Sequence, residues 1–124
     1  GGNPMGTRVA QTALQVIRDE KLTQNARAMG KIFRAKMNEY IESSSIVNLV
    51  RGRGLLNAIL INDTEDSKTA WNICLRLRDK GLLAKPTHGN IIRFAPPLVI
   101  TEEQLLDCIQ IITSTLKEFE PSGS

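Results

Sequence analysis

One arginine set in an apolar extended run is the residue of this sequence best suited to chemistry. Arg93 lies within residues 91–95, and Pro96-Pro97 follow directly. Alternation with a period of two predicts that Ile92 and Phe94 lie on one face of a strand and Arg93 on the other. A guanidinium is always ionised, and its planar fork fits a carboxylate. Arg93 is therefore expected either in a structural ion pair with an Asp or Glu or in the binding of a carboxylate ligand.

The other reactive residue types lack the partners that catalysis or metal binding needs. Cys74 and Cys108 each lie in an apolar pattern of helical period, which favours buried thiols in a reducing compartment over a disulfide. His88 is the single histidine and lies in residues 87–90, a predicted hairpin turn on the surface. No Cys-x-x-Cys or His-x-x-x-His spacing occurs. No metal site is expected.

A glycine-rich segment, Arg51-Gly52-Arg53-Gly54, separates two apolar, β-branched runs. It resembles a phosphate-binding loop only superficially, because neither the Walker A spacing nor the dinucleotide-binding Gly-x-Gly-x-x-Gly spacing is met. A bend or hairpin with solvated arginines is the prediction.

Composition indicates one ordinary soluble domain. The chain has 124 residues, of which 41% are hydrophobic and 23% charged, and its formal net charge is +3. Basic residues are interleaved with apolar ones, and aromatic residues make up 4%, so no nucleic-acid partner is expected. No apolar run is long enough to cross a membrane, and no signal segment opens the chain. Residues 1–4 read as the middle of a loop, so the chain is expected to be part of a longer protein.

Hydrophobic periodicity and capping signals predict eight elements. Asn3 and Pro4 open a helix to Glu20, and a second helical pattern runs over residues 22–41; the interruption at residues 23–25 predicts two helices or one broken helix. Strands are predicted at residues 46–50, 55–61, 82–85 and 91–94. A helix capped by Asp66 or Ser67 and stopped by Gly81, and a last helix opened by the capping box at residues 101–104, complete the set. The order α, α, β, β, α, β, β, α predicts an α+β fold with helices on one face of a small, largely antiparallel or mixed sheet.

Four stretches together resemble one enzyme family. They are Gly1–Pro4 opening a helix, Val50–Ala58, Gly81–His88 and Ile92–Leu98. The chain resembles the C-terminal part of the class III, pyridoxal-phosphate-dependent aminotransferases, from Gly1 to about Phe119. The Leu-Ala-Lys-Pro-Thr-His and Ile-Arg-Phe-Ala-Pro-Pro runs are similar to the ornithine δ-aminotransferase branch in particular.

The resemblance implies a fold and a domain division. The chain would be the C-terminal small domain of a fold-type I aminotransferase, preceded by a long helix from the large domain. Residues 1–41 would link the large domain to the small one, residues 42–120 would form the small α+β domain, and residues 121–124 would be a disordered tail.

The resemblance also implies an activity. The intact enzyme would transfer the δ-amino group of ornithine to pyridoxal phosphate, giving glutamate semialdehyde, and then to α-ketoglutarate, giving glutamate. The cofactor supplies the electron sink. The alternatives are another class III aminotransferase, acting on acetylornithine or γ-aminobutyrate, and a stand-alone, non-catalytic α+β binding module.

Among site residues, the resemblance carries over Arg93. The matching arginine pairs with a glutamate of the large domain in one half-reaction and binds the substrate α-carboxylate in the other. Gly1, Gly2 and Asn3 would lie in a loop near the cofactor. The lysine that carries the cofactor lies upstream in such enzymes, so this chain alone is expected to be inactive, and Lys85 is not that lysine. The intact enzyme would be a homodimer acting on amino acids and keto acids, in the cytoplasm, or in the mitochondrial matrix if the source is eukaryotic.

Overall fold

The computed structural model describes residues 4–64, 66–88 and 90–121, with side-chain surroundings from Arg18 onward. Three helices and four strands follow one another along this part of the chain. They are α1 (Pro4–Glu42), β1 (Val47–Arg53), β2 (Leu56–Ile61), α2 (Thr69–Asp79), β3 (Lys85–Thr87), β4 (Ile91–Phe94) and α3 (Glu102–Phe119).

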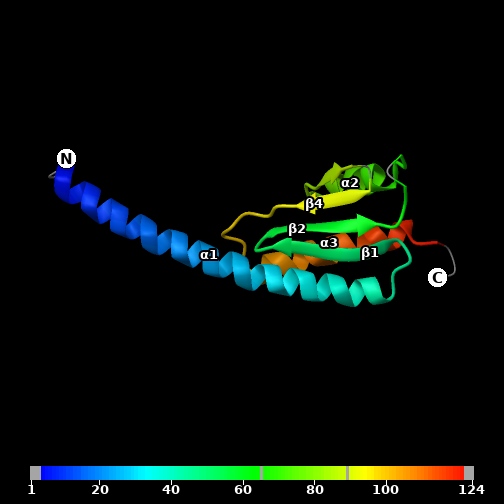
Figure 1. Cartoon of the computed structure of the whole chain (residues 1–124), viewed down its shortest axis with the longest axis horizontal. Coiled ribbons are helices and arrows are strands. Elements are labelled where there is room, and N and C mark those ends of the chain that lie inside the picture. The colour runs from blue at the N-terminus through cyan, green and yellow to red at the C-terminus, as the bar shows by residue number, and fades with distance from the viewer. Residues whose placement is uncertain (1–3, 65, 89, 122–124) are drawn as a thin grey trace.

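The strands form one antiparallel sheet in the order β1-β2-β4-β3. α3 packs against both α1 and α2, and in Figure 1 it runs behind the strands. The described helices therefore form one layer on one face of the sheet. The expected α+β fold, with helices on one face of a small antiparallel sheet, is confirmed.

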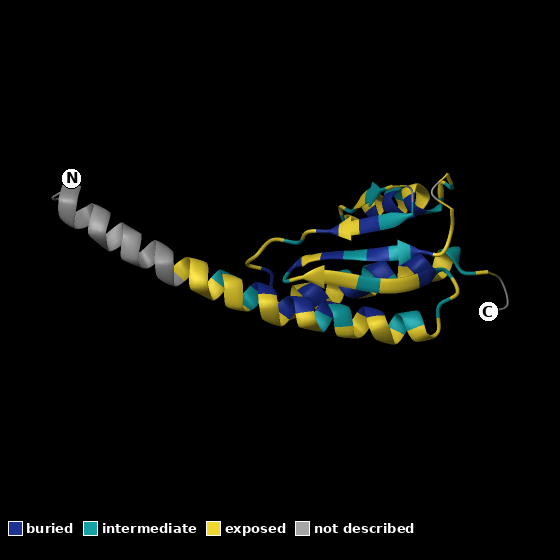
Figure 2. Ribbon diagram, viewed as in Figure 1, coloured by how far each residue is buried: buried dark blue, intermediate teal, exposed yellow. Residues whose placement is uncertain are grey.

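Alternation along the strands divides the sheet into a helix-covered face and an open face. Ile92 and Phe94 of β4 are 0% and 4% exposed, whereas Arg93 between them is exposed, as predicted. β2 alternates in the same way, so that Ile59 is buried and Leu56 is 69% exposed. Figure 2 shows the buried residues gathered where helices meet the strands. The hydrophobic core lies between the helix layer and the sheet.

α1 is one unbroken helix, so the predicted break at residues 23–25 is wrong. The hydroxyl of Thr23 donates to the carbonyl of Asp19 within the helix, at 2.9 Å. The side-chain amide of Asn25 donates to the carbonyls of Leu98 (2.8 Å) and Ile100 (2.9 Å). The apolar pattern is interrupted here without a break in the helix. Asn25 instead binds the segment after β4 to α1. The domain division at residues 41 and 42 stays a prediction.

The two capping predictions had opposite outcomes. α3 opens with the predicted capping box, in which Thr101 and Gln104 bond each other's backbone amides at 3.1 Å. The cap predicted for α2 at Asp66 or Ser67 is misplaced, because the helix begins at Thr69 and its N-cap is Lys68, which makes no side-chain cap. The Ser67 hydroxyl accepts from the Thr69 amide at 3.3 Å, and Asp63 accepts from the Thr69 hydroxyl at 2.6 Å.

Both tight turns predicted after α2 are present. Gly81 follows the helix with φ +92°, and His88 lies between β3 and β4 with φ +51°. The strand predicted at residues 82–85 is misplaced, because β3 spans Lys85–Thr87 and shares only Lys85 with the prediction. The amide of Leu82 donates back to Leu77 of α2 at 2.9 Å instead of joining the sheet.

Candidate functional site

A row of basic side chains crosses the open face of the sheet. Arg93 of β4 lies opposite Lys85 of β3 on one side and opposite Ala58 of β2 on the other. Ala58 in turn lies opposite Arg51 of β1. Directly paired residues of antiparallel strands point to the same face. The four strands thus present three cations around one small alanine.

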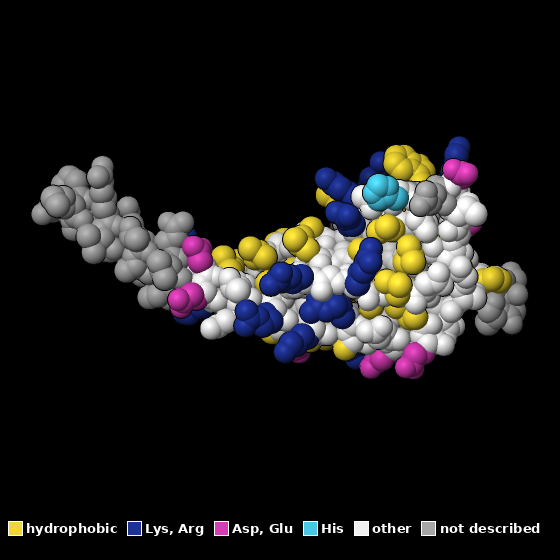
Figure 3. Space-filling model, in the orientation of Figure 1, with side chains coloured by type: hydrophobic (Ala, Val, Ile, Leu, Met, Phe, Trp, Pro, Cys, Tyr) yellow, Lys and Arg dark blue, Asp and Glu magenta, His cyan; other side chains and the backbone are white. Residues whose placement is uncertain are grey.

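This row lines a cleft of about 700 Å³ on the open face. Arg53 adds a fourth cation to its walls, and Leu56 and Leu83 supply apolar surface. No Asp or Glu belongs to the lining residues within the described chain. Figure 3 shows the Lys and Arg side chains over the strands on this face, with the acidic side chains toward its edges. The cleft is therefore suited to an anion.

Arg93 makes no ion pair and no side-chain hydrogen bond with any residue of the described ranges. Its ion pair, one of the two roles open from the sequence, is not formed with a carboxylate of this part of the chain. Ile92 and Phe94, on either side of it, are buried in the core and hold its backbone. The guanidinium is thus placed on a rigid strand with its donor fork free for a carboxylate.

The predicted hairpin with exposed arginines is present, but its turn lies at Gly54 and Leu55, because Arg51, Gly52 and Arg53 still belong to β1 and pair with β2. Gly54 has φ +58°, which favours glycine. A Cβ on Gly52 would lie 2.2 Å from the Asn57 side-chain oxygen, and one on Gly30 of α1 would lie 1.9 Å from the Gly54 carbonyl oxygen. These glycines serve close packing, not phosphate binding.

A buried polar pair ties α1 to this hairpin. A guanidinium nitrogen of Arg34 donates to Asn57 Oδ1 at 2.7 Å and to the Gly54 carbonyl at 3.1 Å. Asn57 is 5% exposed and donates to the same carbonyl at 3.0 Å. The sequence analysis missed this pair. The signal available was a single amide residue at an inward position of an apolar strand.

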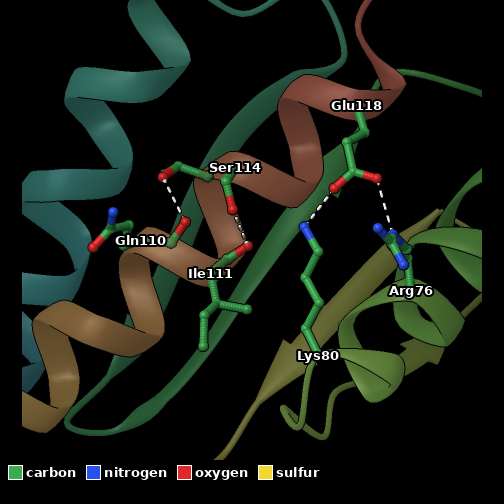
Figure 4. Close-up of polar contacts among 7 residues, drawn as sticks. Arg76, Lys80, Gln110, Ile111, Ser114 and Glu118 are labelled. Atoms are coloured by element: carbon green, nitrogen blue, oxygen red, sulfur yellow. Dashed lines mark hydrogen bonds and ion pairs between the residues drawn. The ribbon is translucent and has the colours of Figure 1, made fainter.

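Arg76 of α2 and Lys80, the residue after this helix's last residue Asp79, both form ion pairs with α3. Figure 4 shows Glu118 of α3 between Arg76, whose Nε lies 2.9 Å from Oε1, and Lys80, which binds the other carboxylate oxygen. Hydrogen bonds from Lys80 and Arg76 lower the pKa of Glu118. These two cations join α2 to α3 and are not available to the cleft.

A second carboxylate, that of Glu120, accepts several hydrogen bonds just after α3. Glu120 accepts from Tyr40 at 2.6 Å, from Ser44 at 2.6 Å and from the Ser45 amide and hydroxyl at 3.0 and 2.8 Å. Burial alone would raise the pKa of Glu120, but these hydrogen bonds together lower it. Burial, with the Glu120 hydrogen bond and charge, raises the pKa of Tyr40. The cluster fixes the loop after α1 to the end of α3.

The remaining reactive residues lie away from the cleft. Cys74 and Cys108 are free thiols, as predicted, but only Cys74 is buried, whereas Cys108 is half-buried. Burial raises the pKa of Cys74 to about 11 and also raises that of Cys108. His88 is exposed in its turn. Within the described ranges, no three His, Cys, Asp or Glu side chains come together as metal ligands would. No described helix has the length and apolar character needed to cross a membrane.

The described residues do not by themselves form a pyridoxal phosphate site. All the lysines of the sequence fall in the described part, and none of them is buried. A lysine that bonds covalently to such a cofactor is normally desolvated to lower its pKa. Gly1, Gly2 and Asn3, expected near the cofactor, lie outside the described residues.

A separate apolar hollow of about 420 Å³ opens beside the end of β4. Phe33, Leu105 and Ile112 form part of its wall, and it has no charged residue among its described lining residues. The basic cleft carries the polar groups that a small-molecule site needs and is the stronger candidate.

Comparisons with known proteins agree on one family. Residues 1–116 match the family described as aminotransferase class III. The mitochondrial ornithine aminotransferase of Rattus norvegicus is 53% identical over 119 residues, which are 96% of this chain and 26% of that protein.

Solved structures show the same relationship. Acetylornithine aminotransferase from Elizabethkingia anophelis is similar with a TM-score of 0.81 and 62% identity, over 96% of this chain and 30% of that one. Ornithine δ-aminotransferase from Plasmodium falciparum gives a TM-score of 0.77 and 40% identity, over 97% and 31%. This chain thus spans roughly a quarter to a third of the length of these relatives. In sequence and in fold, the chain belongs to the class III aminotransferases.

Proposed function

We propose that this chain supplies the carboxylate-binding arginine of a pyridoxal-phosphate-dependent ornithine aminotransferase. The proposal rests on one observation about Arg93. This residue is held on a rigid strand, lines a basic cleft and pairs with no acidic residue of the described chain. The ornithine aminotransferase named above, at 53% identity, supports ornithine as the substrate. The rest of the machinery would come from the larger part of the protein, which this chain does not span.

In the proposed enzyme, Arg93 orients the substrate through its α-carboxylate. The bidentate fork fixes the position and the rotation of the carboxylate, which a point charge does not. Ornithine would give up its δ-amino group in the first half-reaction, and α-ketoglutarate would accept it in the second. In the first half-reaction, Arg93 would instead form an ion pair with a glutamate that lies outside this chain. The cofactor would provide the electron sink and would be bound through a lysine outside these residues.

The partners follow from the same proposal. The intact enzyme would be a homodimer that binds small amino acids and keto acids. Mitochondrial ornithine aminotransferase is among the relatives, which supports a mitochondrial location if the source is eukaryotic.

Acetylornithine is a second candidate substrate. The acetylornithine aminotransferase of Elizabethkingia anophelis is 62% identical to this chain. Both substrates would react at the δ-amine, and they differ at the α-nitrogen, which is a free amine in ornithine and carries an acetyl group in acetylornithine. Assaying the complete enzyme with each substrate in turn distinguishes the two, because the preferred one has the higher kcat/KM.

The assignment of Arg93 is tested by Arg93→Lys in the complete aminotransferase. Lysine keeps the charge and loses the fork, so we expect kcat/KM to fall about tenfold to a hundredfold. The keto-acid half-reaction should lose more than the ornithine half-reaction, because the glutamate released from the arginine can itself hold an amine. Single-turnover kinetics of each half-reaction measure this. Equal losses, or no loss with α-ketoglutarate, would remove Arg93 from the substrate site.

A second experiment tests whether the cofactor lysine lies outside this chain. The purified 124-residue chain, given pyridoxal phosphate, ornithine and α-ketoglutarate, should produce no glutamate semialdehyde, because none of its lysines is buried. Conversion by the chain free of contaminating enzyme would contradict the proposal that the cofactor lysine lies outside it.

A further inference from the structure

Two cations, Lys85 and Arg93, are paired directly across β3 and β4. Lys85 and Arg93 are direct partners in the register, both are exposed, and both line the basic cleft. Side chains at such a pair have their Cβ atoms about 5 Å apart, and like charges placed there repel each other. A carboxylate bound between them would remove that repulsion.

The described chain supplies no such carboxylate. Its ion pairs are Lys36–Glu39, Arg76–Glu118 and Lys80–Glu118, none of which reaches the open face of the sheet. Arg51, one strand beyond Ala58 in the same row, adds positive charge instead of compensating it. A carboxylate bound between the two cations would therefore come from outside this set of residues.

We propose that Lys85 is a second carboxylate-binding residue, which together with Arg93 holds the α-carboxylate of the keto acid. This inference rests on the proposed function of Arg93. A carboxylate has about four lone-pair sites, and the arginine fork uses two of them. The lysine ammonium, a flexible point charge, binds a remaining site from the neighbouring strand. Arg93 then orients the carboxylate, and Lys85 increases its affinity.

The edge strand fixes the position from which Lys85 acts. Pro86, the next residue, lies opposite the buried Ile92 and turns inward while Lys85 turns outward. The ring of Pro86 restricts its own backbone angle and donates no hydrogen bond, as an edge strand tolerates. The backbone of Lys85 is therefore fixed in the edge strand, whereas its long side chain can adjust to the position of the ligand.

Two substitutions of Lys85 in the complete aminotransferase, with a control at Lys31, test the inference. Lys85→Met should raise the KM for α-ketoglutarate about threefold to tenfold, with kcat nearly unchanged, because one charge-assisted contact is lost. Lys85→Arg should stay within about twofold of the parent enzyme. Lys31→Met, at an exposed lysine of α1, is the matched control and should change neither constant. The effect of Lys85→Met should shrink as salt is added.

Charge reversal gives a readout that a purely structural role would not produce. In Lys85→Glu the new carboxylate would pair with Arg93 across the strands and occupy the site. The melting temperature of the unliganded protein should rise while kcat/KM for the keto acid falls. A lysine with only a structural role would move stability and activity in the same direction.

The outcomes separate this inference from the assignment of Arg93. An unchanged KM in Lys85→Met, with Arg93→Lys still impaired, overturns the role of Lys85 and leaves that of Arg93. Unchanged kinetics in both variants overturn both roles. If Lys85→Met lowers the melting temperature without substrate and leaves the KM unchanged, the carboxylate belongs to the protein itself, and the inference is again overturned.

Discussion

The two faces of the small sheet differ in how their polar groups are satisfied. On the helix-covered side, Glu118 binds two cations, Glu120 accepts four hydrogen bonds, and Asn57 is paired with Arg34. On the open side, Arg51, Arg93 and Lys85 stand in one row with no acidic partner in the described chain. Alternate residues of the same strands face these two sides.

This difference separates stability from function. Glu118, Glu120 and Asn57 on the covered side are matched within the chain, as expected because an unpaired buried group costs free energy; the buried hydroxyls of Thr87 and Thr115 are exceptions. Like charges on the open side repel one another and so lower stability, and no acidic residue of the described chain offsets that repulsion. The proposed carboxylate ligand would account for such a cluster, whereas the pairs on the covered side follow from the fold alone. Three predictions probe the contrast, beyond the kinetic tests of Arg93 and Lys85.

The largest expected effect comes from neighbouring isoleucines on opposite faces. Ile92→Ala removes a side chain that is 0% exposed, so we expect the free energy of unfolding to fall by about 2–5 kcal/mol. Ile91→Ala, one residue earlier on the open face, should cost about 1 kcal/mol or less. Urea denaturation of the 124-residue chain measures both. Equal losses would mean that the open face is buried as deeply as the covered one.

Close packing at the hairpin should give the next largest effect. Gly30→Ala places a Cβ where the Gly54 carbonyl oxygen lies, 1.9 Å away, and should lower the free energy of unfolding by about 1–3 kcal/mol. In an exposed helix position the same change would stabilise the protein. Asn38→Ala, exposed on the same helix, is the control and should lose nothing. A Gly30→Ala protein as stable as its parent would rule out this contact between α1 and the hairpin.

The smallest expected effect concerns the Glu120 cluster and pH. Its folded pKa lies below the ordinary value of 4.5, so its contribution is complete above that pH and is lost as pH falls through the folded pKa. At pH 7, Glu120→Gln should be less stable by about 1–2 kcal/mol. The gap should close in acid, whereas Glu42→Gln at the exposed end of α1 should show none. A gap that persists in strong acid would mean that the carboxylate charge is irrelevant to the cluster.

Much of the fold was predictable because local signals were strong. The period-two pattern around Arg93, the capping box at Thr101 and the glycine after α2 each act within a few residues, and each appears as predicted. The break in α1 and the cap of α2 were mispredicted for the opposite reason. Asn25 bonds to carbonyls more than seventy positions away, and Asp63 holds the start of α2 from outside the expected turn.

The sequence by itself determined that Arg93 points away from the core, because its neighbours need burial and strand geometry alternates. It also carried the family resemblance that the comparisons support. Only the tertiary structure decided that Lys85 and Arg51 share a face and a row with Arg93. Strand order and register depend on how α1, α2 and α3 pack beneath the sheet, and no local pattern along the chain encodes which strands become neighbours.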